Sequence, residues 1–216
     1  MSDAIERTLA QVLDDGVFVA VRLKSPDGAA QGCRAAARGG LRVLEITLTT
    51  PGALDIIREL AGDVDLVVGA GTVLTVADAK AVADAGGCFA MSPVTDRKVV
   101  DEAHRLGLLA VPGAGSATEI LEASRMGARL VKVFPAGPIG GPDFVRKVRG
   151  PLPDIPLVPT SGPSRETIAD YVAAGAVAVG VGSEVLPDGF SLGAVEEAAR
   201  SLRVAMDAAR ASVAGG

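Results

Sequence analysis

Short hydrophobic runs, many of them rich in valine, recur along the chain, and a turn and then an amphipathic segment follow each run. This pattern predicts eight strands, Val17–Val21, Val43–Leu48, Leu66–Val68, Phe89–Met91, Leu108–Val111, Leu130–Val133, Leu157–Pro159 and Ala176–Val181. The segments between them carry apolar residues at helical spacing. Hydroxyl side chains stand where these helices are expected to begin, at Ser25, Thr50, Thr75 and Ser116.

Regular alternation of strands and helices is typical of parallel strands joined by right-handed crossovers. Eight such units in 216 residues favour the α/β class and a closed (β/α)8 TIM barrel. An open doubly wound sheet is the alternative, but it usually has a glycine-rich turn after its first strand, and Arg22–Ser25 contains no glycine. No linker divides the chain, so we expect one domain, residues 1–216. We also expect an extra N-terminal helix over Ser2–Leu13 and a frayed tail after Asp207.

Composition narrows the classes of function. Hydrophobic residues make up 49% of the chain and aromatic residues 3%, which predicts a core of small aliphatic side chains. The net charge of −5 comes without a basic cluster, which argues against a nucleic-acid partner. The sequence has no apolar run of membrane-spanning length and no secretion-signal pattern, and it has two well-separated cysteines, so we expect a cytoplasmic protein without a membrane partner.

A single lysine, Lys132, interrupts the apolar run that ends before Pro135. Side chains alternate along a strand, so Lys132 is expected on the opposite face from Val131 and Val133. Apolar surroundings disfavour a charged ammonium group, and a neutral amine attacks carbonyl groups to form a Schiff base. The alternative is a lysine whose charged end reaches solvent.

The same alternation directs Glu45 into the barrel interior, together with Val43 and Thr47. Two ionisable groups in one apolar interior favour a functional site over a structural ion pair, because desolvation tends to cancel the attraction between buried charges. A neutral Lys132 would form an imine with a ketone, and Glu45 would carry protons as general acid and base. The sequence therefore predicts retro-aldol chemistry without a metal.

Three glycine-containing loops are candidate anion sites, because they leave backbone N–H groups free. They are Val68–Thr72, Thr160–Gly162 and Gly180–Ser183. The last two follow the seventh and eighth strands, where barrels often bind phosphate. Pro93 is a candidate for lining the site. His104 is expected on a helix surface, and the sequence shows no cluster typical of a transition-metal site.

Several short motifs stand in order along the chain, Glu45–Thr50, Gly69–Leu74, Ser92–Pro93, Val111–Gly113, Val131–Ala136, Val158–Thr160 and Val181–Ser183. In combination they resemble the class I aldolases that cleave 2-keto-3-deoxy-6-phosphogluconate (KDPG), a family that includes 4-hydroxy-2-oxoglutarate (KHG) aldolases. The resemblance implies a (β/α)8 barrel, commonly a homotrimer. It also implies an enzyme without a cofactor that releases pyruvate and an aldehyde such as D-glyceraldehyde 3-phosphate.

The resemblance also implies roles for individual residues. Lys132 matches the Schiff-base lysine, Glu45 the proton-transferring carboxylate, and Thr72 the threonine that holds the pyruvyl carboxylate. Phe134 matches the aromatic residue beside the lysine, and Thr160 a position that influences which C4 epimer is accepted. The phosphate-binding loops are represented by Ser161, Gly162, Gly182 and Ser183.

Some positions depart from the family pattern. Thr49 stands where many members have an arginine that binds the pyruvyl carboxylate, and Arg22 matches an arginine that other members carry at the end of the first strand. Ser161 replaces a usual glycine, Pro163 removes an N–H donor, and Glu184 adds an anion after Ser183, which Arg165 would offset.

These departures keep an unphosphorylated 2-keto-4-hydroxy acid open as the substrate, for example KHG cleaved to pyruvate and glyoxylate. Two further alternatives are a sugar-phosphate isomerase or epimerase barrel and a non-catalytic binder of phosphate ligands. Neither alternative predicts a covalent adduct with pyruvate.

Overall fold

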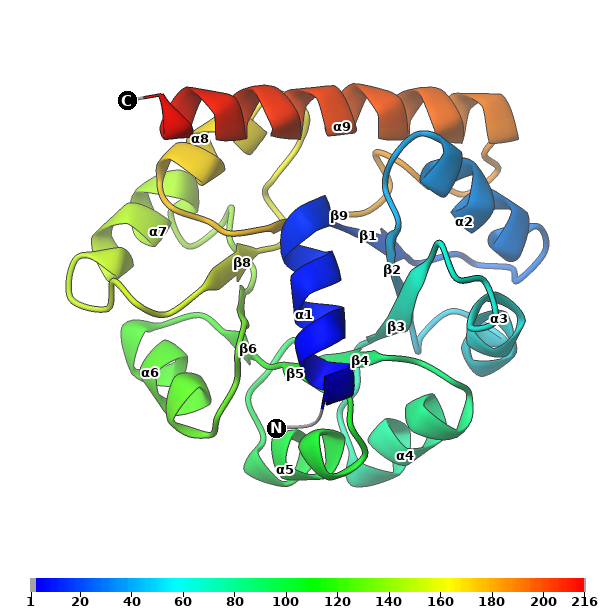
Figure 1. Cartoon of the computed structure of the whole chain (residues 1–216), viewed down its shortest axis with the longest axis horizontal. Coiled ribbons are helices and arrows are strands. Elements are labelled where there is room, and N and C mark those ends of the chain that lie inside the picture. The colour runs from blue at the N-terminus through cyan, green and yellow to red at the C-terminus, as the bar shows by residue number, and fades with distance from the viewer. Residues whose placement is uncertain (1–2, 216) are drawn as a thin grey trace.

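The computed structural model describes residues 3–215 and places parallel strands at its centre with helices around them (Figure 1). The strands are β1 (Val17–Val21), β2 (Val43–Thr47), β3 (Val67–Gly71), β4 (Phe89–Met91), β5 (Leu109–Val111), β6 (Gly113–Ala114), β7 (Val131–Val133), β8 (Leu157–Pro159) and β9 (Val179–Val181). The helices are α1 (Asp3–Asp15), α2 (Ala29–Arg38), α3 (Ala53–Leu60), α4 (Val76–Asp84), α5 (Arg97–Arg105), α6 (Ala117–Arg125), α7 (Gly141–Arg149), α8 (Ile168–Ala173) and α9 (Leu192–Ala214).

The strand order shows a parallel sheet that curls. Six strands pair in the order β5-β4-β3-β2-β1-β9, and three more pair in the order β6-β7-β8. The first and last strands are neighbours, and a parallel bridge between Thr160 and Gly180 connects the end of β8 to β9. The α/β class and the parallel pairing are therefore as predicted, with strand boundaries shifted by up to three residues and with β6 missed by the sequence pattern.

The two faces of the strands pack into two separate cores. Leu44 and Ile46 of β2 belong to the core between strands and helices, whereas Val43 belongs to the inner core with Phe18 and Phe89. The rings of Phe18 and Phe89 meet edge to face, with their centroids 5.4 Å apart. The predicted alternation of β2 is confirmed. It directs every second residue of the strand toward the interior.

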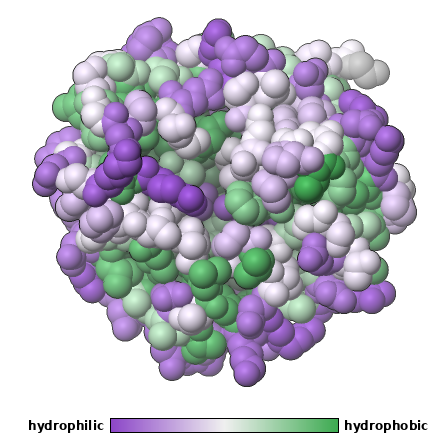
Figure 2. Space-filling model, turned by 180° about the vertical axis from the view of Figure 1, so that it is seen from behind, coloured by the Kyte–Doolittle hydropathy of each residue, from purple (hydrophilic) through white to green (hydrophobic). Residues whose placement is uncertain are grey.

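Helix α1 packs at the amino ends of the strands. Its buried residues Ile5, Leu9 and Val12 join the inner core with the first residues of β2 and β3. The helix falls where an N-terminal helix is expected, although Ser2 lies outside the described residues. Since α1 occupies this end of the strands (Figure 1), the opposite face remains for ligands, and Figure 2 shows hydrophobic and hydrophilic patches on that face.

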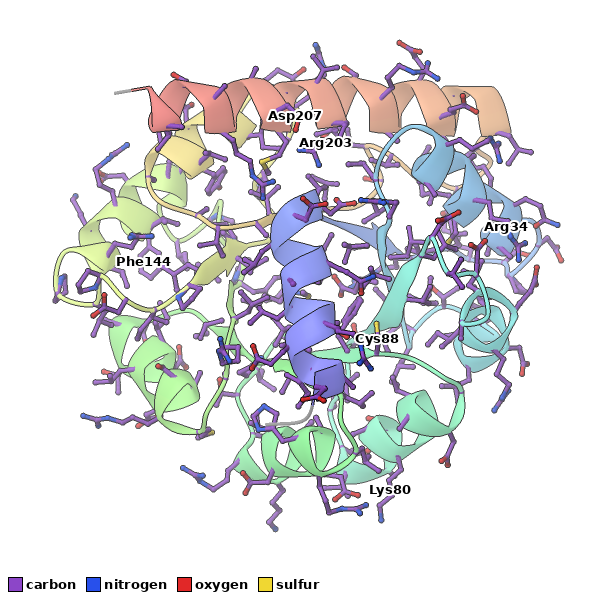
Figure 3. The ribbon with its side chains drawn as sticks, in the orientation of Figure 1. Arg34, Lys80, Cys88, Phe144, Arg203 and Asp207 are labelled. Carbon is purple, nitrogen blue, oxygen red and sulfur yellow. The ribbon has the colours of Figure 1, made fainter. Side chains whose placement is uncertain are left out.

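The expectation of a frayed tail after Asp207 is wrong. Helix α9 continues to Ala214 and buries Met206 and Ala209. Arg203 donates to the backbone carbonyl of Asp15, and Arg210 donates to the carbonyl of Asp14 at 2.7 Å. Figure 3 shows Arg203 and Asp207 on the side of α9 near the end of α1. These contacts hold the C-terminal helix against α1, which a local sequence pattern does not reveal.

The observed helix N-termini agree with those predicted from the sequence at some sites and differ at others. Thr75 forms a capping box with Asp78, and Ser116 accepts from the Glu119 N–H, as N-caps do. Helix α3, however, begins after Gly52 rather than at Thr50, whose hydroxyl bonds to the end of β1 instead. In the described part of the chain, no helix has both the length and the hydropathy needed to cross a membrane.

Candidate active site

Lys132 and Glu45 come together inside the curled sheet. Lys132 is the middle residue of β7 and Glu45 the middle residue of β2. The Lys132 Nζ atom lies 3.6 Å from Glu45 Oε1, with side chains only 6% and 2% exposed. The neighbours Val131 and Val133 face the outer core. The prediction that both ionisable groups point into one interior is confirmed.

The carboxylate of Glu45 has an oxygen without a partner. Oε2 is buried and makes no hydrogen bond with the described residues. A buried polar atom left unsatisfied costs about 1–3 kcal/mol, and more for a charged group. Such an atom is available to accept a proton or a hydrogen bond from a ligand, and this is the arrangement that a general base requires.

Gly71 of β3 leaves the space that the Glu45 side chain occupies. A Cβ atom at Gly71 would lie 1.9 Å from Glu45 Oε1 and 2.7 Å from its Cγ. The pairing of β2 with β3 places Gly71 beside Thr47, next to the carboxylate. The sequence predicts that this glycine-containing loop binds an anion. The geometry shows a second requirement for glycine at position 71, which is space for the Glu45 side chain. The sequence alone did not indicate this requirement.

A cavity of about 400 Å³ opens above the pair at the carboxyl ends of the strands. The Lys132 amine lies 5.3 Å from the centre of the Phe134 ring. The residues that line the cavity are Ala20, Arg22, Glu45, Lys132, Phe134, Thr160, Ser161, Pro163, Gly180, Val181, Gly182 and Ser183. Eight of the twelve residues predicted for the site thus surround one space.

Arg22 brings an uncompensated positive charge to this cavity. It directly follows β1, and its exposed side chain makes no ion pair or hydrogen bond with another described residue. A guanidinium group has five donors in a planar arrangement that suits a carboxylate or a phosphate. Arg22 is therefore free to bind an anionic group of a ligand.

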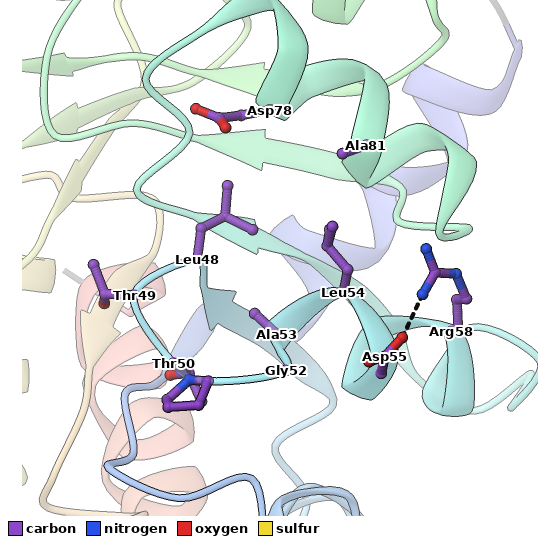
Figure 4. Close-up of a pocket in the computed structure, with 11 residues that line it drawn as sticks. Leu48, Thr49, Thr50, Gly52, Ala53, Leu54, Asp55, Arg58, Asp78 and Ala81 are labelled. Carbon is purple, nitrogen blue, oxygen red and sulfur yellow. Dashed lines mark hydrogen bonds and ion pairs between the residues drawn. The ribbon is translucent and has the colours of Figure 1, made fainter.

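Thr49 lies on a different cavity. It lines a space of about 520 Å³ together with Leu48, Leu54 and Asp78. Figure 4 shows these side chains between the start of α3 and α4. The Thr49 hydroxyl oxygen is 3.2 Å from that of Thr47. The structure therefore does not bring Thr49 to the cavity that Lys132 and Arg22 share.

Thr72, Pro93 and Gly162 are also absent from the lining of the Lys132 cavity. Thr72 follows β3 in a left-handed conformation with φ of 61°, and Pro93 lies directly against the backbone of Gly113. Gly162 packs against the Gly137 backbone and the Tyr171 hydroxyl, where a Cβ atom would clash. All three lie in loops or turns that follow strands of the parallel sheets.

Backbone strain is concentrated at two predicted site residues. Within residues 3–215, Thr72 and Ser161 are the two non-glycine residues with a left-handed backbone, at φ of 61° and 62°. This conformation costs a non-glycine residue free energy and is enriched at functional sites. Ser161 replaces a glycine of the resembled family and nevertheless keeps the backbone shape that favours glycine.

The carboxylate of Glu184 is held by a neighbouring loop. Glu184 Oε1 accepts from the Arg165 backbone N–H at 3.0 Å, while the Arg165 guanidinium pairs with Glu166 at 2.7 Å. The side chain of Arg165 therefore does not pair with Glu184, contrary to the offset that the sequence suggested. Pro163 lines the cavity and donates no N–H to it.

Other polar groups lie away from this cavity. His104 is half-buried rather than fully on the surface, and desolvation lowers its pKa from the ordinary value. Both cysteines are free thiols, and Cys88 donates to the Val68 carbonyl. In the described ranges, no group of three or more histidine, cysteine or acidic residues is arranged to hold a metal.

The architecture and the buried amine–carboxylate pair are those of a Schiff-base lyase, and comparison with known proteins gives the family. The model of the KDPG and KHG aldolase family matches residues 10–198, so the chain belongs to this family of aldolases. Among curated relatives, the 2-dehydro-3-deoxy-phosphogluconate aldolase of Pseudomonas aeruginosa is 40% identical over 154 residues, which cover 71% of this chain and 70% of the relative.

A second relative and a solved structure extend the match. The KHG/KDPG aldolase of Escherichia coli K12 is 32% identical over 196 residues, covering 90% of this chain and 92% of the relative. The KDPG aldolase of Legionella pneumophila, solved with pyruvate captured at low pH as a covalent carbinolamine intermediate, superposes with a TM-score of 0.81 at 28% identity. That match covers 88% of this chain and 96% of the Legionella chain.

Proposed function

We propose that this protein is a metal-independent class I aldolase that reversibly cleaves KDPG to pyruvate and D-glyceraldehyde 3-phosphate. The observation that carries the proposal is the buried pair of Lys132 and Glu45, with Nζ and Oε1 3.6 Å apart beneath an open cavity. A structural ion pair has no need of a cavity above it or of a carboxylate oxygen without a partner. A site for covalent catalysis needs both.

The chemistry follows from these two groups. The neutral Lys132 amine adds to the C2 carbonyl of the keto acid, and the carbinolamine loses water to give a protonated imine. Glu45 then takes the proton of the C4 hydroxyl while the C3–C4 bond breaks. The electron pair of the broken C3–C4 bond moves toward the protonated imine and neutralises its nitrogen, which gives an enamine. The aldehyde leaves, Glu45 returns the proton to C3, and water hydrolyses the pyruvyl imine to pyruvate and free lysine.

We assign the carboxylate of the keto acid to Arg22, because Arg22 is a free cation on the cavity and Thr49 lies on another one. A bidentate contact with a carboxylate suits its guanidinium group. Thr72 would add a hydroxyl from the loop after β3, and Phe134 would pack on the carbon chain beside the lysine. Thr160, whose hydroxyl meets Gly180 inside the cavity, would contact the C4 end.

The tail of the substrate would lie against the loops after β8 and β9. Ser161, Gly182 and Ser183 line the cavity there. Gly162 packs the loop after β8 against the Gly137 backbone. Pro93 would border the site near β6. A second candidate substrate is an unphosphorylated 2-keto-4-hydroxy acid such as KHG, because Pro163 offers no N–H and Glu184 keeps a negative charge on this rim.

Three further properties belong to the same proposal. The pairing of β1 with β9 and the bridge from Thr160 to Gly180 support a closed (β/α)8 barrel. We propose that this barrel forms a single domain, residues 1–216. Exposed apolar side chains at Leu74 and Val94, in the loops after β3 and β4, support burial against other copies in a homotrimer. The free thiols support a reducing cytoplasm.

Borohydride reduction in the presence of pyruvate tests the proposal. We expect the mass of one reduced pyruvyl group on the wild type, located at Lys132 by peptide mapping, and none on Lys132→Ala. Side-by-side retro-aldol assays on KDPG and KHG then rank the two substrates. An isomerase or a passive binder would give neither an adduct nor pyruvate, and that result would refute the proposal.

A further inference from the structure

Threonine hydroxyls tie the end of β2 to the backbone on both sides of Arg22. Thr50 Oγ1 donates to the Val21 carbonyl at 3.1 Å and accepts from the Leu23 N–H at 3.2 Å. Thr47 Oγ1 donates to the same Val21 carbonyl at 3.2 Å. Both neighbours of Arg22 in the chain are therefore bound to Thr50.

The hydroxyl protons can be assigned without conflict. Each hydroxyl has one proton, and the hydroxyl oxygens of Thr47 and Thr50 also lie 3.2 Å apart. Thr50 directs its proton to the Val21 carbonyl, and Thr47 directs its proton to the same carbonyl or to Thr50 Oγ1. The contact of 3.2 Å between Thr49 and Thr47 is then a bond that Thr49 donates. The network is buried, since Thr47 is 0% and Thr50 2% exposed, so water does not compete for these bonds.

The network begins where the strand pairing stops. The register of β1 with β2 ends at the pair Val21 and Ile46, one residue before Arg22. Beyond that point the hydroxyls continue the connection between the two strands. Helix α3 does not use the Thr50 hydroxyl, because its N-terminus follows Gly52 and has no side-chain cap.

We propose that Thr50 is a positioning residue that holds the backbone of Arg22 so that the guanidinium group meets the carboxylate of the keto acid. This inference rests on the proposed function and on the assignment of that carboxylate to Arg22. The Arg22 side chain has no partner among the described residues, so only the backbone determines the point from which this side chain extends. Val21 and Leu23 are buried on the outer side, which leaves residue 22 facing the cavity.

The expected consequence is a change in binding rather than in chemistry. A misplaced Arg22 weakens the contact with a carboxylate that is present in both the bound substrate and the transition state. Thr50→Val removes the hydroxyl and keeps the size, and we expect it to raise KM about 3- to 10-fold, the scale of one buried hydrogen bond. We expect kcat to change less than about 2-fold, within the usual scatter of independent sites.

A double-variant cycle separates positioning from general structural damage. Thr50→Ser, which keeps the hydroxyl, should restore the wild-type KM. In an Arg22→Met background, Thr50→Val should raise KM no further, because the residue it positions is gone. Thr8→Val is the matched control, since Thr8 is a buried threonine on α1 with a hydroxyl bond of 3.0 Å to Ala4. It should leave KM unchanged.

The dependence of borohydride trapping on pyruvate concentration gives a second measure of binding. Unchanged KM and trapping in Thr50→Val, an effect on kcat alone, or additive effects with Arg22→Met would each overturn the inference. If Thr50→Val does not fold, Thr47→Val takes its place. We expect this variant also to raise KM with little change in kcat, but by a smaller factor. A wild type that forms no adduct defeats the proposed function instead, so the two failures are distinguishable.

Discussion

Lys132 and Glu45 lie in the middle of two strands, whereas the groups expected to bind the substrate's tail lie on loops at the cavity's rim. The interior pair is almost wholly buried, and its neighbours on each strand are packed in the outer core. At the rim, Ser183 and Glu184 are exposed, and the nearby charges pair with one another across the surface.

The two regions therefore differ in how freely they can change. A substitution inside must preserve strand register and a dry environment, because a buried charge without its partner is strongly destabilising. A substitution at the rim alters one exposed contact at small cost. Three departures from the family pattern, Ser161, Pro163 and Glu184, lie at the rim, and a fourth, Thr49, lies on another cavity. We therefore expect the interior pair to set the reaction and the loops at the rim to set the choice of aldehyde.

The largest effect is expected from Lys132→Ala, which removes the nucleophile. Aldol cleavage should fall by about 10⁴-fold or more, as when other covalent catalysts lose their nucleophile. Initial rates of pyruvate release measure this loss. Lys147→Ala, at an exposed lysine paired with Asp143, is the control and should keep full activity. Substantial cleavage by Lys132→Ala would show that the interior pair does not carry the reaction.

Glu45→Gln should slow kcat by roughly 10²–10⁴-fold while the pyruvyl adduct at Lys132 still forms, though more slowly. The amide keeps the shape of the side chain and cannot accept a proton. Single-turnover cleavage together with borohydride trapping separates the two steps. An unaltered kcat would assign the proton transfers to another group and leave Glu45 only an electrostatic role.

Gly71→Ala should displace the Glu45 side chain, because the new methyl group would overlap it. We expect kcat to fall about 10-fold or more, with a loss in the free energy of unfolding of about 1–3 kcal/mol from overpacking. Gly62→Ala is the control, because nothing lies within 4 Å of the position of its Cβ atom. Equal behaviour of the two variants in kinetics and thermal melts would mean that the interior is less rigid than its packing indicates.

Glu184→Gln tests the rim and should give the smallest change. It removes a negative charge and keeps an oxygen that accepts from the Arg165 N–H. An exposed charge contributes about 1 kcal/mol or less, so KM for KDPG should fall no more than about 5-fold, and less at high salt. KM for KHG serves as the internal control, since KHG carries no phosphate. A decrease for both substrates alike would contradict a role in recognising the phosphorylated tail.

Local patterns in the sequence predicted most of the strands, because alternating and continuous apolar runs report directly which residues are buried. They failed where a contact is distant in sequence. Helix α9 is held by bonds from Arg203 and Arg210 to the end of α1, and nothing in the tail itself indicates these partners. Thr50 is a residue type typical of an N-cap, but helix α3 begins only after Gly52, and the Thr50 hydroxyl bonds to the end of β1 instead.

The amino-acid sequence is sufficient to predict that Lys132 and Glu45 face inward and that the chain resembles a family of aldolases, because strand alternation and the order of motifs are properties of the linear sequence. The folded structure is needed to show that the two groups lie 3.6 Å apart. It is also needed to show that Arg22 reaches their cavity while Thr49 does not. Such distances depend on how a curled sheet brings non-adjacent strands together, and the spacing of residues along the chain does not contain that information.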